Sequence, residues 1–462
     1  MLADVLSSKY EVRIIGFLFE KYGSSLWEPL KNSSIPLHIY RGNSFPDFNR
    51  ILNSIALENK ADLIIVSKPR LPSMQLGLIM KSIYNLPLIL DIDDYEIAFV
   101  KDSGFRKSDL MVPYGGTWTR YSERLIDYAE NIFVSNIALQ EKYGGTIIPH
   151  VRDEEIFFPQ LYNRKQRRKE LGLPVDDKIV LFLGTPRKHK GLLKLLEGVK
   201  QCGDPSYKLC IIGSFPDQEL KEYMQSMGGE SLLLLPDQPF EDIASNTVIA
   251  DLVCILQDQD SEIARYQLPA KVIDAIAMAV PVLATPIRPL EPFIKQGLVF
   301  PTTESDLTCD LHHYLDNSGY YQEKQLDKRE IFLREYSYSS AFSKMERIIE
   351  DAIQSTRSLP GEALNYVNLQ TDLIEEVDSM IQPYRDKLHN IEKGYRETRS
   401  EFRKKLQKKD DELKTIAIKL EQLILDYNQL LSSKSWRYTR PLRKIGVYYL
   451  LVKQKLLRQL GN

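Results

Sequence analysis

The chain of 462 residues is too long for a single hydrophobic core, so we expect two or three domains. Its 43% hydrophobic and 27% charged residues are typical of a soluble globular protein, and a formal net charge of −2 gives no indication of a nucleic-acid partner. The four cysteines are scattered and the sequence shows neither a signal peptide nor an apolar run as long as a membrane span, which predicts a cytosolic body.

The first third of the chain alternates between strand-like and helix-like segments. This alternation predicts a parallel sheet with helices on its faces. Residues 1–10 already read as a helix, although such domains normally begin with a strand and a glycine turn. We therefore expect that the first strand is missing or that the start codon has been placed too late. The expected strands are 11–17, 37–40, 62–67, 87–91, 131–135 and 146–149, and the expected helices are 48–59, 76–84 and 121–129.

An acidic segment, DIDDYE, closes the fourth of these strands. Its carboxylates Asp91, Asp93 and Asp94 follow an apolar run, and an Asp-x-Asp pair in this position is able to hold a divalent metal. The alternative is that Asp93 and Asp94 cap the next helix or line the carboxyl ends of the strands. We favour the alternative and expect these residues to contact an acceptor.

A charged linker, residues 152–178, precedes a second and clearer alternation. Two doubly wound domains that face each other leave a ligand cleft between their strand ends. The expected strands of the second block are 179–183, 208–212, 232–235, 252–256 and 281–285, and its expected helices are 192–201, 218–227, 240–249 and 271–278.

The segment 178–191, KIVLFLGTPRKHKG, joins the first strand of this block to its first helix. A cationic loop between a strand and a helix N-terminus favours phosphate, because backbone N–H groups and the helix dipole attract the anion while Arg187, Lys188 and Lys190 neutralise it. The alternative is an ordinary turn with solvated basic residues.

A second segment, residues 267–285, places Asp274 on a helix made otherwise of apolar residues. A carboxylate in such surroundings needs a partner. Ribose hydroxyls are one candidate, and a salt bridge to Lys271 or Lys295 is the other.

Together, these two segments resemble the donor-binding half of the nucleotide-sugar glycosyltransferases of family 4 (group 1), which have the GT-B fold. The family pattern G-R-x4-K-G is matched by Gly184, Lys190 and the glycine after it, while Thr185 stands at the usual arginine and Arg187 is the plausible substitute. Residues 146–159 and 334–345 similarly resemble the interdomain segment and the closing helix that crosses back to the first domain.

The second family pattern, E-x7-E, is matched only in part. Asp274 falls on the second acidic position and Tyr266 on the first, so one glutamate is missing. The family variant P-S/A-K-x-x-E/D is matched by a Pro-Ala-Lys that ends at Lys271. Glu262 lies in the loop that would contact the sugar.

The resemblance implies a fold, a set of domains and a mechanism. Residues 1–160 would form a Rossmann-like acceptor domain, 161–335 a Rossmann-like donor domain, and 336–358 the crossover helix. Arg187 and Lys190 would be catalytic, because they would stabilise the leaving diphosphate. The family transfers with retention and the leaving phosphate takes the acceptor's proton, so neither a metal nor a cofactor is expected.

Within this scheme the other candidate residues have secondary roles. Gly184, Thr185, Lys271 and Glu262 would contribute to donor binding and Asp274 would hold the ribose. His150 joins the three aspartates as a weak candidate for the acceptor cleft, and as a lone histidine it is more often structural.

Residues 359–432 read as a helical region that contains a coiled coil, with an earlier helical stretch interrupted at Pro383. A coiled coil predicts a homodimer, and the alternative is one amphipathic helix packed on the catalytic body. The seam follows a strict four-three spacing with one lysine in it, at Phe402, Leu406, Lys409, Leu413, Ile416, Leu420, Leu423, Tyr427 and Leu430.

The last segment, residues 433–462, is basic, and its SKSWRYTRPLR resembles a C-terminal motif of some bacterial polysaccharide glycosyltransferases. An apolar face among lysines, with Trp436 at its edge, suits an anionic bilayer. This predicts a peripheral enzyme at the inner face of the plasma membrane, although a partner's acidic face is the alternative.

The sequence therefore predicts a glycosyltransferase that takes a sugar from a nucleoside diphosphate sugar and adds it to a surface polysaccharide or lipid-linked glycan. The main rival is a catalytically silent GT-B scaffold, suggested by the missing glutamate and the missing first strand. A nucleotide-sugar epimerase with the same fold is a third and weaker hypothesis.

Overall fold

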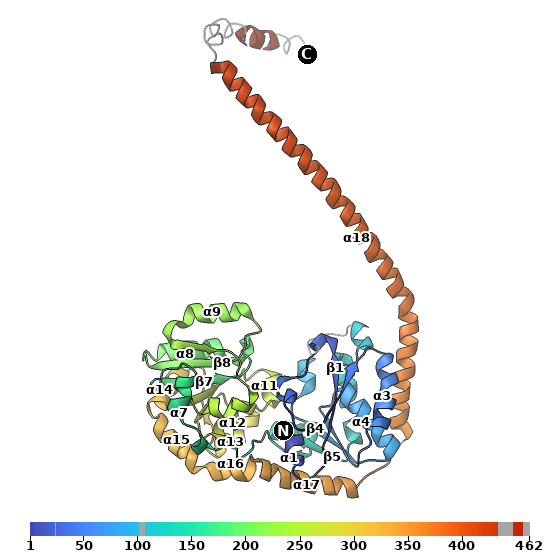
Figure 1. The fold of residues 1–462 in the computed structure, drawn as a ribbon, viewed down its shortest axis with the longest axis vertical. Helices are drawn as coiled ribbons and strands as arrows, with labels where there is room; N and C mark the ends of the chain where they lie inside the picture. The colour runs from blue at the N-terminus through green and yellow to red at the C-terminus, as the bar shows by residue number, and fades with distance from the viewer. Residues whose placement is uncertain (24, 101–106, 360, 433–446, 456–462) are drawn as a thin grey trace. The chain divides into compact units, whose positions relative to one another are not determined.

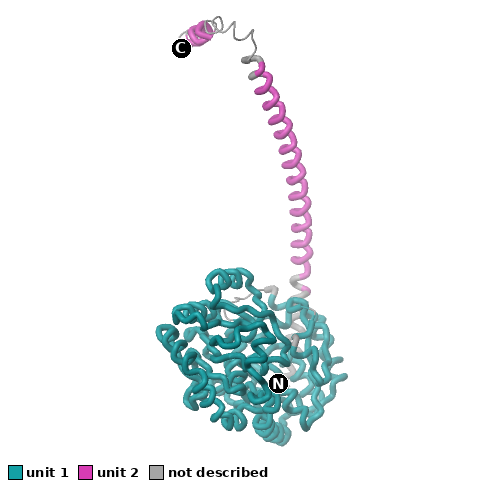
Figure 2. Tube along the Cα trace, turned by 60° about the vertical axis from the view of Figure 1, so that its left-hand side comes forward, with its two compact units in different colours: residues 1–376 teal, residues 377–462 magenta. Residues whose placement is uncertain are grey.

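The structure is a computed structural model that describes residues 1–23, 25–100, 107–359, 361–432 and 447–455 (Figure 1). It divides into two compact units, Met1–Glu376 and Val377–Asn462, which Figure 2 shows in different colours. The first unit contains all of the described strands, in three sheets, and carries the candidate site. The two units are described separately below.

The N-terminal part of the first unit, here residues 1–150, holds two parallel sheets. Strands β1 (Ile14–Phe19) and β2 (Leu37–Gly42) form one, and the other has the order β3-β4-β5-β6. The second sheet comprises β3 (Ile64–Ser67), β4 (Leu88–Ile92), β5 (Asn131–Val134) and β6 (Thr146–Ile147). The main helices are α1 (Leu2–Leu6), α2 (Glu28–Lys31), α3 (Asp47–Glu58), α4 (Leu71–Tyr84), α5 (Gly116–Glu123) and α6 (Ile137–Tyr143), with 3-10 turns η1 (Glu20–Tyr22), η2 (Glu96–Phe99), η4 (Lys107–Met111) and η5 (Ile126–Tyr128).

The central part, residues 163–335, is built on a six-stranded parallel sheet of order β12-β11-β10-β7-β8-β9. Strand β7 lies inside this sheet, where the chain first moves outward through β8 and then returns to the other side at β10. The carboxyl end of β7 is therefore a topological switch point, the usual ligand position of open α/β sheets. The strands are β7 (Lys178–Leu183), β8 (Tyr207–Ile212), β9 (Leu232–Leu235), β10 (Leu252–Ile255), β11 (Val282–Ala284) and β12 (Phe300–Pro301).

Helices cover both faces of the central sheet. Successive β7 side chains point to opposite faces: Ile179 and Leu181 pack in the core beneath α10, α12 and α16, whereas Val180 and Phe182 pack beneath α8, α9 and α14. Burying each of these apolar side chains stabilises the fold by roughly 1.5–3 kcal/mol. The helices are α7 (Arg164–Glu170), α8 (Leu192–Gln201), α9 (Gln218–Gly228), α10 (Ile243–Thr247), α11 (Glu262–Tyr266), α12 (Ala270–Ala277), α13 (Glu291–Lys295), α14 (Leu307–Asp316), α15 (Ser318–Asp327) and α16 (Arg329–Glu335), with 3-10 turns η6 (Pro159–Leu161), η7 (Lys188–Lys190), η8 (Gly229–Ser231), η9 (Phe240–Asp242) and η10 (Arg288–Leu290).

Helix α17 (Tyr338–Gln354) returns from the central part and packs on the N-terminal sheet, where Met345 and Ile348 join Ile89 and Phe133 in one core. The expected closing helix at 334–345 is thus two helices. They are separated by Ser337, whose hydroxyl caps α17 by accepting from the N–H of Ser340.

The predicted strands agree with the structure to within a few residues, although β12 was not predicted, and several helical regions differ. Helix α4 begins at Leu71 and not near residue 76, and the short helices α2, α6, α11 and α13 were not predicted. The helix expected at 121–129 is α5 followed by the turn η5, so it begins at Gly116. Helices α14, α15 and α16 were not predicted, because their apolar residues alternate with many polar ones and are interrupted by short turns.

The second unit is helical where it is described. Helix α18 (Gly361–Ser432) is continuous through Pro383, which corrects the expected interruption there. A proline removes one backbone hydrogen bond, and in this helix the backbone continues beyond it. Residues 447–455 form a further helix, while 433–446 and 456–462, including Trp436 and the SKSWRYTRPLR motif, lie outside the described residues. Within the described ranges, no helix has the length and apolar character to cross a membrane.

Candidate active site

Two glycine backbones meet at the carboxyl ends of β7 and β8. Gly184 has φ +123° and Gly213 has φ +152°, and a Cβ on Gly213 would lie 2.3 Å from the carbonyl oxygen of Gly184. Only glycine fits such an approach. The chain therefore turns sharply at Gly184, at the switch point of the sheet.

Two lysine ammonium groups lie close to this turn. A Cβ on Gly184 would lie 3.0 Å from Lys271 Nζ, so the ammonium sits against the Gly184 backbone, and it also lies 5.1 Å from the centre of the Phe182 ring. Burial and the nearby charge of Lys190 lower the pKa of Lys271 to about 8. Among the described residues, Lys271 has no hydrogen-bond or ion-pair partner. A half-buried cation of this kind is suited to an anionic ligand.

Lys190 and Arg187 belong to the same loop. Burial and the charge of Arg187 lower the pKa of Lys190, and Asp94 of the N-terminal part opposes this effect. Arg187 and Thr185 are exposed. Lys188 forms an ion pair with Asp217 at 3.1 Å, so it is engaged on the outer side of the loop. The site consequently gathers three positive side chains, Lys190, Lys271 and Arg187, at the end of β7.

Asp274 has a different partner from the two that the sequence suggested. Its Oδ1 atom lies 2.5 Å from Arg152 Nε, and both side chains are largely buried. Lys271 is directed toward Gly184 instead, and Lys295 lies 3.9 Å from Glu291. Backbone hydrogen bonds hold Arg152 beside the junction of α16 and α17: its N–H donates to the carbonyl of Tyr336, and its carbonyl accepts from the N–H of Tyr338.

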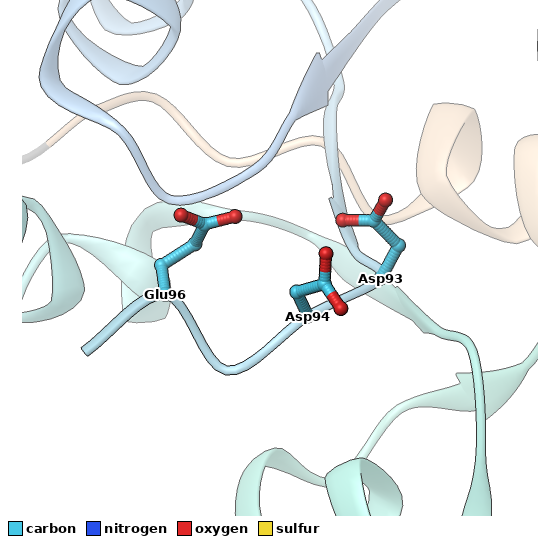
Figure 3. A group of neighbouring side chains, drawn as sticks. All are labelled: Asp93, Asp94 and Glu96. Carbon is cyan, nitrogen blue, oxygen red and sulfur yellow. The ribbon is translucent and has the colours of Figure 1, made fainter. Parts of the chain in front are cut away.

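The acidic segment after β4 surrounds one lysine. Lys68 Nζ lies 3.0 Å from Asp93 Oδ1, 3.1 Å from Asp94 Oδ2 and 3.0 Å from Glu96 Oε1 (Figure 3 shows the three carboxylates). Burial opposes the charge on Lys68, but the carboxylates outweigh it and raise the pKa of the ammonium. Asp93 and Asp94 are therefore ion-paired rather than helix caps, since the turn η2 has no side-chain cap.

Asp91 and His150 lie in the same electrostatic environment. Burial and the charge of Asp93 raise the pKa of Asp91 to about 8. Burial and Arg152 lower the pKa of His150, which favours its neutral form, while Asp93, Asp94 and Asp274 oppose the shift. Two of these four acceptor-side candidates also interact with predicted donor residues: the charge of Asp94 acts on Lys190, and that of Asp274 acts on His150.

Residues 163–323 match the family model described as "Glycosyl transferases group 1". This match covers most of the central part, which is built on the six-stranded sheet. A curated relative, TuaC of Bacillus subtilis (strain 168), is named for a role as a glycosyltransferase in teichuronic acid biosynthesis and is 24% identical over 124 residues. That match spans 27% of this chain and 28% of the length of TuaC.

Solved structures show the fold of the rest of the body. HepE from Anabaena in complex with UDP and glucose is 15% identical with a TM-score of 0.58, over 76% of this chain and 94% of HepE. A glycosyltransferase from Rickettsia africae is 14% identical with a TM-score of 0.56, over 75% and 99%. WaaG, a glycosyltransferase of lipopolysaccharide biosynthesis, has a TM-score of 0.52 at 14% identity, over 75% and 93%. The fold is GT-B, as predicted.

The central part meets the N-terminal part through Tyr266, the residue at the position of the missing glutamate. Its carbonyl accepts a hydrogen bond from Asn136 Nδ2 at 2.8 Å, and its ring packs 4.9 Å from that of Tyr95. Gln267 Nε2 donates to Asp94 Oδ1 at 3.0 Å. Tyr266 thus packs across the interface, a role that its place in a sequence pattern does not reveal.

The structure also places the remaining candidates and adds others. Glu262 is half-buried at the start of α11, so it lies on a helix and not in the expected loop. Lys68, Glu96 and Arg152 were not singled out from the sequence, and no local pattern identifies them because each meets its partners only through tertiary packing. Lys68 does carry one structural sign, a backbone φ of +66°, which costs a non-glycine residue about 1–2 kcal/mol.

Proposed function

We propose that this protein is a glycosyltransferase that transfers a sugar from a nucleoside diphosphate sugar, with retention, to a surface polysaccharide or lipid-linked glycan. The observation that supports it best is the half-buried Lys271 ammonium beside the Gly184 turn, together with Lys190 and Arg187. These groups neutralise a diphosphate, and the exposed turn and the start of α8 offer backbone N–H groups to it.

Each residue then has a defined task. Lys190 and Arg187 stabilise the charge that develops on the leaving diphosphate when the bond to the anomeric carbon breaks. Asp274 faces the ribose with the carboxylate that Arg152 holds in place, and Glu262 contributes to the donor side. Asp91, Asp93, Asp94 and His150 form the acceptor side. The leaving phosphate accepts the proton of the attacking hydroxyl, so no protein side chain need act as the base.

The relatives guide the choice of substrates. HepE was solved with UDP-glucose, so UDP-sugars are the first donors to offer. TuaC is named for teichuronic acid synthesis, which favours a cell-surface polysaccharide as the acceptor. Purified protein would be mixed with UDP-, GDP- and other activated sugars while protection against unfolding and release of nucleoside diphosphate are measured. Binding and slow hydrolysis of one donor would support the proposal, and failure of every donor would favour the silent scaffold.

Donor affinity is expected to fall as the pH rises through about 8. The pKa of Lys271 is lowered to about 8, so the ammonium is charged below that pH and loses its charge above it. Because a diphosphate binds to the charged form, affinity should be constant at lower pH and then decrease, by up to about tenfold per pH unit. Titration calorimetry from pH 6.5 to 9.5 measures this. Lys271→Arg should remove the decrease, whereas an unchanged profile in that variant would assign it to another group.

We further propose that the protein dimerises through α18. The seam positions whose side chains are described are all highly exposed, among them Leu406, Leu413 and Ile416. Lys409 forms an ion pair with Glu412 of its own helix at 2.9 Å, which reduces the cost of a charge in the seam. A second copy would cover these apolar residues. Tyr427 and Leu430 complete the proposed seam, and their side chains lie outside the described residues.

Ile416→Lys is expected to convert the proposed dimer into a monomer, because each helix would then place two charged residues, Lys409 and the new lysine, in the seam. Ile418→Lys is the matched control, because Ile418 lies off the seam. The two side chains have similar exposed fractions, 67% for Ile418 and 61% for Ile416. Light scattering on the full chain measures the mass. A monomeric native protein, or an equal effect of both variants, would contradict the coiled coil.

The C-terminal segment is proposed to bind the inner face of the plasma membrane. In the helix at 447–455, Tyr448, Leu450 and Leu451 are exposed beside Lys453 and Lys455. Apolar residues beside lysines suit an anionic bilayer surface. Co-flotation of the full chain with anionic but not with neutral vesicles would support this, and equal recovery with both would contradict it.

A further inference from the structure

One ammonium group occupies the centre of the acidic segment. The ion pairs from Lys68 to Asp93, Asp94 and Glu96 measure 3.0, 3.1 and 3.0 Å. Lys68 directly follows β3 and has a left-handed backbone, fixed by a hydrogen bond from its N–H to the carbonyl of Asp91 at 2.8 Å. A strained backbone at a non-glycine residue persists only where its surroundings hold it firmly.

The three carboxylates have the spacing of a cation site. One oxygen from each of Asp93, Asp94 and Glu96 lies within 4.8 Å of the others (Figure 3). Hard divalent cations take such oxygens as ligands. In this protein the Lys68 ammonium contacts all three residues, and Arg70 adds a second cation on Glu96. The protein's own lysine therefore stands where a divalent ion would be bound.

The contact continues into the central part. Asp94 uses its Oδ2 atom for Lys68 and its Oδ1 atom for the side chain of Gln267. Gln267 caps the C-terminal end of α11, and Leu268 and Pro269 connect it to α12, the helix that carries Lys271 and Asp274. The charge of Asp94 also acts on Lys190. The Asp94 carboxylate thus links Lys68, which follows β3, to Gln267 and Lys190 on the donor side.

We propose that Lys68 is a positioning residue for sugar transfer: its ammonium takes the place of a divalent cation among Asp93, Asp94 and Glu96 and holds Asp94 in the orientation that binds Gln267. The effect of Lys68 on the rate of sugar transfer rests on the proposed transferase function. The position of its ammonium among the three carboxylates does not depend on that function. Removing Lys68 has two expected effects, one on the alignment of the two parts and one on the affinity of the carboxylates for metal.

The first test uses Mn²⁺ as the probe, followed by electron paramagnetic resonance on the full chain without nucleotide. Lys68→Ala is expected to gain one Mn²⁺ site that the native protein lacks, and Lys68→Ala combined with Asp93→Asn should lose it again. Lys165→Ala is the control, because Lys165 pairs with Asp176 on the exposed surface at 3.2 Å. Equal Mn²⁺ binding by the native protein and Lys68→Ala would overturn the inference. Lys68→Met, which keeps the apolar stem, serves if the alanine variant does not fold.

The second test measures turnover of the donor that the native protein uses. Lys68→Ala is expected to lower kcat at least tenfold, with a smaller change in KM, and Mn²⁺ should restore part of the loss. Gln267→Ala should also lower kcat, and the double variant should lose less than the product of the two single effects, because both act through Asp94. Full activity in Lys68→Ala, or fully multiplicative losses, would overturn the positioning role. If no donor is used by the native protein, the proposed function fails while the Mn²⁺ result still decides the role of Lys68.

Discussion

Replacement of Lys190 by alanine is expected to lower donor turnover by roughly 100-fold or more, since one preorganised charged group at a developing oxyanion contributes about that much to kcat. Lys190 is half-buried beside Arg187 and Lys271, where low exposure to water strengthens its attraction for a diphosphate. Protection of the protein by the donor against thermal unfolding should also decrease. Both quantities are measured with the donor that the panel of activated sugars identifies.

Lys188→Ala provides the matched control. Lys188 lies in the same 3-10 turn, carries the same charge and is 67% exposed in its ion pair with Asp217. Its loss should leave turnover within about twofold of the native value, because a surface ion pair contributes little. Equal losses in the two variants would indicate a general effect of loop charge. Unchanged turnover in Lys190→Ala would contradict the assignment of the catalytic lysine.

Arg152→Ala is expected to lower the free energy of unfolding by about 3 kcal/mol, the usual consequence of leaving one member of a buried ion pair alone. The Arg152 and Asp274 side chains are 15% and 9% exposed, so water replaces little of the lost interaction. Arg152 also contacts the Phe157 ring, with 5.6 Å between its guanidinium carbon and the ring centre. Urea denaturation followed by circular dichroism measures the change.

An exposed ion pair of the same region gives the comparison. Lys165 and Asp176 are 71% and 85% exposed, so Lys165→Ala should change stability by less than about 1 kcal/mol. Asp274→Asn should affect both stability and donor binding, because it removes the charge that Arg152 pairs with and also the proposed ribose ligand. If Arg152→Ala were as stable as the native protein, Asp274 would have to be held by another group.

The local pattern of the sequence determined most of the architecture. Buried parallel strands are continuous apolar runs and their crossover helices carry apolar stripes, so β7, β8 and α8 were predicted almost residue for residue. The placement of three candidate residues was predictable for the same reason: Gly184 and Lys190 lie between β7 and α8, and Lys271 lies on α12.

Partners of the charged residues were decided only by the tertiary structure. Asp274 and Arg152 are 122 residues apart in the chain, and the acidic segment after β4 meets Lys68 from a different strand. A carboxylate on an apolar helix predicts that a cationic or hydrogen-bonding partner is present. The sequence does not show which residue it is, so the nearby lysines Lys271 and Lys295 were both candidates.

Tyr266 and Pro383 illustrate the same limit. The tyrosine at the missing glutamate suggested a defect, yet it packs against Tyr95 across the interface. The proline suggested a break, yet α18 continues through it. Hydrophobic periodicity and turn residues are local signals that the sequence carries by itself. Which charges meet, and which residues join the two halves of the GT-B body, depends on how the sheets pack, and only the folded structure decides that.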